Sequence, residues 1–204
     1  MRLNVVRLAT AMLSFCALGP SLAANTETQP IDVLRSQVER AITLLKTPET
    51  DTGAARTEQR EQLCALAEEM FDVRTFSRLV LMSNWQDFEA AQQAQFVEVF
   101  SDFLCRYYIS RLQLYYAGES VTFVAQEMKS PTRAIVSVVL HWQSMDIPVE
   151  VRMVKRDEQW RAFDLAVSGI SAVLVYRAQF QPILLRESPQ FLIETLQQRI
   201  AEQG

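Results

Sequence analysis

The spacing of apolar residues changes twice along this chain, and that change constrains the fold more than any other feature. Between residues 31 and 116 apolar side chains recur three or four positions apart, which is typical of amphipathic helices. After Gly118 they alternate with polar neighbours in about four short runs, as in strands, and helical spacing returns after Gly169. Short links between the runs favour antiparallel pairing. The sequence therefore predicts an α+β fold, with an antiparallel sheet of about four strands packed against several helices.

Local signals mark the expected boundaries. Helical spacing predicts a first helix over 31–45. Thr57 can cap a second helix, and a helical pattern then continues up to Trp85. Asp87 is the expected N-cap of the longest helix, 88–116, and Ser188 followed by Pro189 is expected to begin the last helix. Strands are expected from Val121 and over 133–142, 147–154 and 160–165. No repeat or linker interrupts this order, so we predict a single domain over 31–204.

The first residues have the three parts of a secretory signal peptide. Arg2 and Arg7 precede an apolar run over 8–18, and a small-x-small cleavage signal ends at Ala23. We therefore predict a removed signal peptide over 1–23 and a flexible N-terminus over 24–30. The apolar run is shorter than the ~20 residues that span a bilayer, and no second run of that length follows. Phe15 stands where lipidation of Cys16 would require a small residue, so we expect no lipid anchor.

Composition argues against several classes of function. The chain is acidic, with net charge −4, and nucleic-acid binding requires clustered Lys and Arg. His141 is the single histidine and falls inside an expected strand, with no nucleophile elbow elsewhere. The clusters required for zinc, calcium or phosphate loops are missing from the sequence. Asp164 is expected to be a structural acid that accepts turn or cap hydrogen bonds. We therefore expect no enzyme, no metal and no cofactor.

Two patterns leave alternatives open. Cys64 and Cys105 lie on apolar sides of expected helices, where an oxidising compartment allows either a disulfide or two buried thiols. The apolar stripe from Phe96 to Tyr107 on the longest helix fits either a filled core or a ligand cavity. Periodicity alone does not separate the two.

Two blocks of the sequence resemble the MlaC family, also called toluene-tolerance proteins. The first comprises Phe71-Asp72-x-x-x-Phe76, then Trp85, Gln92, Phe96, Phe100, Leu104, Tyr107 and Tyr115. The second comprises Trp160-Arg161-Ala162-Phe163-Asp164, then Ser168-Gly169-Ile170-Ser171, then Tyr176-Arg177-Ala178-Gln179-Phe180. The resemblance covers about residues 31–200 and implies helices on a bent antiparallel sheet, with a lipid cavity between them.

The resemblance also implies a function. Similar proteins are periplasmic shuttles that exchange phospholipid between an outer-membrane lipoprotein complex and an inner-membrane ABC transporter bearing MCE domains. We expect this chain to be a monomer. We expect apolar residues that face between helices and sheet to bind the lipid, namely Phe76, Leu79, Phe96, Phe100, Phe103, Tyr107, Val136, Val138, Leu140, Val149, Val151, Met153, Ile170, Val173 and Leu174. Tyr176 and Arg177 are expected near the mouth of the cavity. Arg177 would meet either a lipid phosphate or Asp164.

Three other functions remain open from the sequence. The ligand could be another lipid, such as a hopanoid. The protein could be an extracytoplasmic hydrolase of lipids or esters built around His141, or a scaffold domain with a solid core.

Overall fold

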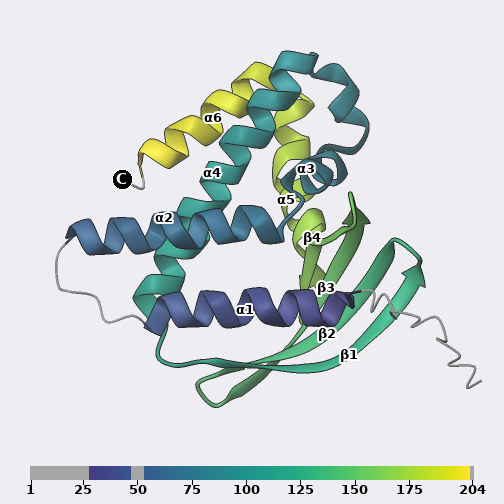
Figure 1. Ribbon diagram of the computed structural model, residues 1–204. Helices are drawn as coiled ribbons and strands as arrows, with labels where there is room; N and C mark the ends of the chain where they lie inside the picture. The colour runs from purple at the N-terminus through teal and green to yellow at the C-terminus, as the bar shows by residue number, and fades with distance from the viewer. Residues whose placement is uncertain (1–27, 47–52, 203–204) are drawn as a thin grey trace, which may run out of the picture.

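The structure, a computed structural model, describes residues 28–46 and 53–202 (Figure 1). The predicted signal peptide over 1–23 lies outside the described residues, as does most of the predicted flexible N-terminus. The helices are α1 (Pro30–Lys46), α2 (Gly53–Met70), α3 (Val73–Leu81), the 3₁₀ helix η1 (Met82–Asp87), α4 (Ala90–Tyr115), α5 (Ala172–Leu184) and α6 (Pro189–Ala201). The strands are β1 (Ser120–Ser130), β2 (Arg133–Trp142), β3 (Met145–Arg156), β4 (Gln159–Val167) and β5 (Ile170–Ser171).

The strands form one antiparallel sheet in the order of the sequence, β1-β2-β3-β4-β5. This confirms the predicted α+β fold, with one short strand more than expected. The links are tight turns: Asp157 and Glu158 between β3 and β4 both have positive φ, as do Ser168 and Gly169 between β4 and β5. Two consecutive positive φ values match the twist of an antiparallel hairpin. The turns therefore explain why the sheet follows the chain order.

The helices divide into two groups around this sheet (Figure 1). Helix α1 lies across β1 and β2, with α2 beside it, while α3, α5, α6 and part of α4 form a bundle beyond β4. Leu34 of α1 packs with the buried side chains of β2, β3 and β4 in one apolar cluster. The bundle has a second cluster of its own, and Phe71 contacts both.

Two predicted helix starts are wrong. Helix α2 begins at Gly53, and Thr57 lies inside it, donating its hydroxyl to the Gly53 carbonyl oxygen (3.0 Å). Helix α4 begins after Glu89, which forms a capping box with Gln92, so that Asp87 belongs to η1. At α4 the reciprocal hydrogen bonds of Glu89 and Gln92 provide the cap two residues after the predicted one. The predicted start of the last helix is confirmed, because Ser188 caps α6 and Pro189 is its first residue.

Cys64 and Cys105 form a disulfide in this structure, with Cα atoms 5.6 Å apart. The bond joins α2, which lies beside the sheet-covering helix α1, to α4 of the bundle. It thereby links the two helical groups covalently. No helix within 28–46 and 53–202 is long and apolar enough to cross a membrane.

Candidate functional site

The face of the sheet that α1 covers, called here the inner face, is a continuous apolar surface along β2 and β3. Its central pairs are Val136 opposite Val151 and Val138 opposite Val149, and directly paired residues point to the same side of a sheet. Leu140 continues the inner row of β2 at one end, and Met153 continues the inner row of β3 at the other end. The structure therefore places all six predicted sheet residues on one face, the one that packs against α1.

A β-bulge carries the inner face onto β4 and adds residues that the sequence analysis missed. Met153 pairs with Ala162, but Arg152 pairs with Asp164, so Phe163 has no direct partner. The extra residue reverses the alternation of β4. Beyond it, Leu165 pairs with Val151 and therefore shares its face. Val167 pairs with both Val149 and Ile170 and continues that row. The signal in the sequence is the break in alternation between Ala162 and Leu165.

The inner face is closed at one end and open at the other. Under α1 and Phe71, Val136 and Met153 are 0% exposed and Val151 is 4% exposed. At the opposite end, which we call the open end, Val149 is half-buried, Val167 is 47% exposed and Ile170 is 64% exposed. An apolar surface that starts in the core and continues to solvent is a favourable site for a ligand with long apolar chains.

The predicted helical residues lie elsewhere. Phe76, Phe96, Phe100, Phe103, Val173 and Tyr176 form the buried cluster of the bundle, and Leu79 and Tyr107 pack against it. Their rings fill this cluster: the Phe100 ring lies 5.6 Å from that of Phe76 and 5.3 Å from that of Phe180. Burial raises the pKa of the Tyr176 hydroxyl, which donates to the Tyr108 hydroxyl oxygen (3.1 Å). Two other residues that were predicted to bind lipid from outside the main strands, Ile170 and Leu174, are exposed.

Asp164 is structural, as expected. It is 1% exposed and accepts hydrogen bonds from the Ser171 hydroxyl (2.7 Å), the Val173 amide (3.1 Å) and the Arg152 guanidinium (2.8 Å). The alternative in which Arg177 pairs with Asp164 is therefore corrected, since Arg152 from the adjacent strand occupies that position. Arg177 instead donates to the Leu79 carbonyl oxygen (2.6 Å) near the end of α3, where a cation is favourable.

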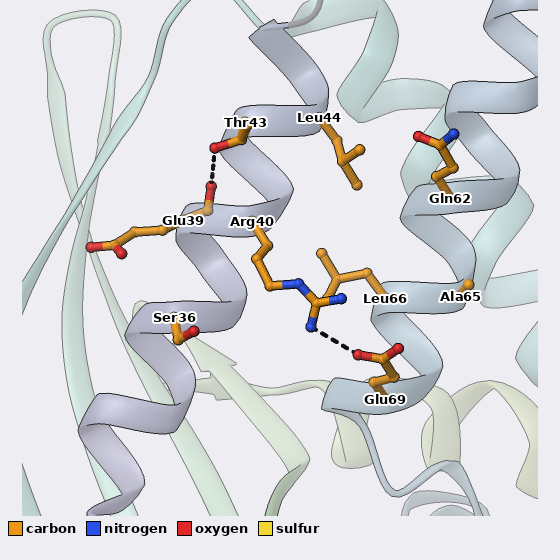
Figure 2. A pocket seen from close by; sticks show the side chains of 9 residues that line it. All are labelled: Ser36, Glu39, Arg40, Thr43, Leu44, Gln62, Ala65, Leu66 and Glu69. Atoms are coloured by element: carbon orange, nitrogen blue, oxygen red, sulfur yellow. Dashed lines mark hydrogen bonds and ion pairs between the residues drawn. The ribbon is translucent and has the colours of Figure 1, made fainter.

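A pocket of about 610 Å³ lies between α1 and α2 (Figure 2). Arg40 of α1 spans it to reach Glu69 of α2 (2.9 Å), while Leu44 and Leu66 point into the space between the helices. Its other lining residues are Ser36, Glu39, Thr43, Gln62 and Ala65. Helical periodicity places this lining on the side of α1 away from Leu34 and the sheet. None of the predicted lipid-binding residues lines it.

His141 belongs to a polar group on the opposite, outer face of the sheet. Its Nε2 lies 2.8 Å from the Thr122 hydroxyl oxygen, and its Nδ1 lies 2.7 Å from a carboxylate oxygen of Asp146. Thr122 and Asp146 are exposed, and none of the three lines the pocket between α1 and α2. In the part of the chain that the structure describes, no group of three His, Cys, Asp or Glu side chains is arranged to hold a metal ion.

Comparison with known proteins agrees with the fold described above. The family model for the MlaC protein matches residues 35–198. Among solved structures, a phospholipid-binding protein from Ralstonia solanacearum, in complex with a phospholipid, has a similar fold, with a TM-score of 0.72 at 18% identity. The match covers 86% of this chain and 99% of that one. A comparison with curated proteins gives no significant match. Because the family model spans most of its length, this chain belongs to the MlaC family.

Proposed function

We propose that this protein is a lipid carrier that holds the acyl chains of a phospholipid against the inner face of its sheet. The observation that carries the proposal is the gradient along that face, from Met153 at 0% exposed to Ile170 at 64% exposed. Acyl chains would continue the apolar surface of the closed end, and the headgroup would remain near solvent at the open end. The family and the phospholipid complex of the Ralstonia protein support the same ligand class.

The energetics of acyl chains suit a carrier. Burial contributes ~0.8 kcal/mol per methylene, so two chains of about fifteen methylenes gain roughly 24 kcal/mol relative to water. A free lipid therefore rarely crosses an aqueous gap alone. Relative to a membrane, which buries the same chains, the gain nearly cancels. A protein surface of similar apolarity can thus load and unload, without a nucleophile, metal or cofactor.

The family and the amino-terminal sequence support a proposal for the cellular role. We infer that the mature protein acts in the periplasm after removal of the signal peptide. There it would exchange phospholipid between an outer-membrane lipoprotein complex and an inner-membrane ABC transporter with an MCE domain. Asp164 and the disulfide are compatible with this role, because neither belongs to the apolar rows of β2 and β3 on the inner face.

A matched pair of variants tests the proposed site. Val149 and Glu150 are neighbours on β3 that point to opposite faces. Val149→Arg introduces a charge into the acyl surface, and we expect it to lose most of the co-purifying lipid. Glu150→Arg changes the exposed outer face and should retain it. Lipid extracted from each purified protein and identified by mass spectrometry is the measurement.

The same measurement separates the alternatives. Wild-type protein that carries no lipid at all would contradict the proposal. A bound hopanoid in place of phospholipid would keep the carrier and change its ligand. Ester hydrolysis that disappears in His141→Ala would instead favour the hydrolase.

A further inference from the structure

The segment from Leu165 to Tyr176 carries no charged residue, although it crosses the surface. It contains the end of β4, the turn, β5 and the first turn of α5. Val167, Ile170, Leu174 and Val175 on it are between 41% and 64% exposed. Large exposed apolar side chains gathered in one segment mark a surface that meets something apolar.

These side chains lie close together. Val167 and Ile170 face each other across the β4–β5 hairpin. Ser171 is the N-cap of α5, so Ile170 and Val175 occupy the two positions of a hydrophobic staple, which bring their side chains side by side. Leu174 lies in the same first turn of the helix. We call this group, Val167, Ile170, Leu174 and Val175, the apolar rim.

Backbone polar groups around the apolar rim are satisfied within the protein. The Ser168 amide donates to the Pro148 carbonyl oxygen (2.8 Å). At the start of α5, where a helix normally leaves amides free, the Val173 amide donates to Asp164 (3.1 Å) and the Leu174 amide to the Ser171 hydroxyl (3.4 Å). A surface that enters hydrocarbon needs its polar backbone groups paired internally, because the lipid offers no partners. The apolar rim meets that requirement at these amides.

The apolar rim is also continuous with the inner face. Val167 pairs with Val149, and Leu165 pairs with Val151, which is buried in the sheet cluster. An apolar path therefore leads from the closed end of the inner face to the rim. An acyl chain that moved between the rim and the inner face would meet apolar side chains along this path.

We propose that the apolar rim is the surface with which this protein contacts a lipid bilayer directly during loading or unloading. The inference rests on the proposed function, because loading and unloading presuppose a lipid cargo. Contact between the rim and a bilayer can nevertheless be measured separately. Membrane contact of this kind scales with the apolar area that inserts. Aliphatic side chains in a segment without charge suit the acyl region of a bilayer, where a charged group would be costly.

The experiment uses the purified mature protein and vesicles of phosphatidylethanolamine and phosphatidylglycerol, with no other protein present. Sedimentation measures vesicle binding, and a fluorescent phospholipid measures transfer from donor to acceptor vesicles. We expect Ile170→Glu and Val175→Glu each to reduce vesicle binding and lipid transfer by roughly tenfold or more. This is the effect of losing one inserted aliphatic side chain. Leu185→Glu is the matched control, because Leu185 is 77% exposed at the other end of α5, and it should behave as wild type.

Each outcome decides the proposal. Rim variants that bind vesicles and transfer lipid as wild type does would overturn it. Wild-type protein that neither binds vesicles nor transfers lipid without a partner protein would also overturn it, and would assign the rim to a protein interface. If mass spectrometry finds no lipid in the purified protein, lipid carriage fails. The sedimentation arm still reports on the bilayer contact in that case.

Discussion

The two apolar clusters of this protein differ in composition and in how completely they close. The cluster of the bundle is aromatic and packs against itself, with Phe96 and Phe100 0% exposed. The inner face of the sheet is aliphatic along β2 and β3, and its open end is left uncovered. Both arise from apolar residues at regular spacing. The difference teaches that regular apolar spacing can produce a closed core in the bundle and a partly exposed face on the sheet, and that exposed part is the surface we propose for acyl chains.

Truncating the centre of the bundle should produce the largest effect on stability. Phe100 contacts the rings of Phe76, Phe96, Tyr176 and Phe180. Phe100→Ala should lower the free energy of unfolding by about 3–5 kcal/mol, because a buried ring leaves a cavity that neighbours refill only partly. Urea unfolding monitored by circular dichroism checks this. Tyr115→Ala on the same helix, at a 58% exposed position, should cost less than about 0.5 kcal/mol. A loss below about 1 kcal/mol for Phe100→Ala would contradict a closed aromatic core.

Removing the covalent link between the two helical groups should have the next largest effect. The disulfide closes a loop with a sequence separation of 41 between Cys64 and Cys105. Replacing both with Ser should reduce the free energy of unfolding by about 2–4 kcal/mol, since the unfolded chain regains the freedom of that loop. Thermal unfolding with and without reductant provides the measurement. Reductant should destabilise the wild type and leave the double variant unchanged. If the bond is reduced and the wild type is as stable as before, the bond contributes little to stability.

A pair of identical substitutions compares the two ends of the inner face. Val151 at the closed end is 4% exposed and Val167 at the open end is 47% exposed. Val151→Ala should cost about 1–3 kcal/mol of unfolding free energy, whereas Val167→Ala should stay within about 0.5 kcal/mol. Chemical denaturation of lipid-free protein gives both values. Equal losses of unfolding free energy in the two variants would mean that Val167 is packed in solution. The open end would then not be available to an acyl chain.

Much of this fold follows from local patterns in the sequence. The change of period after Gly118 located the sheet, and the alternation over 147–154 placed Val149, Val151 and Met153 on one face of their strand. Ser188 and Pro189 located the start of α6. Such features depend on neighbours within a few residues, which is why they can be inferred without knowing the rest of the molecule.

Other features were decided only by tertiary structure. The sequence predicted that the stripe from Phe96 to Tyr107 is apolar, but only packing showed that α3, α5 and α6 cover it. The bulge at Phe163 reversed the parity of β4, and Arg152 took the place at Asp164 that had been open to Arg177. The physical reason is the same in each case. Periodicity determines which side of an element is apolar, whereas what covers that side depends on segments distant in the sequence. The sequence by itself thus determined the order of the elements, and the tertiary structure decided which face of the sheet α1 covers and that one end of that face stays open.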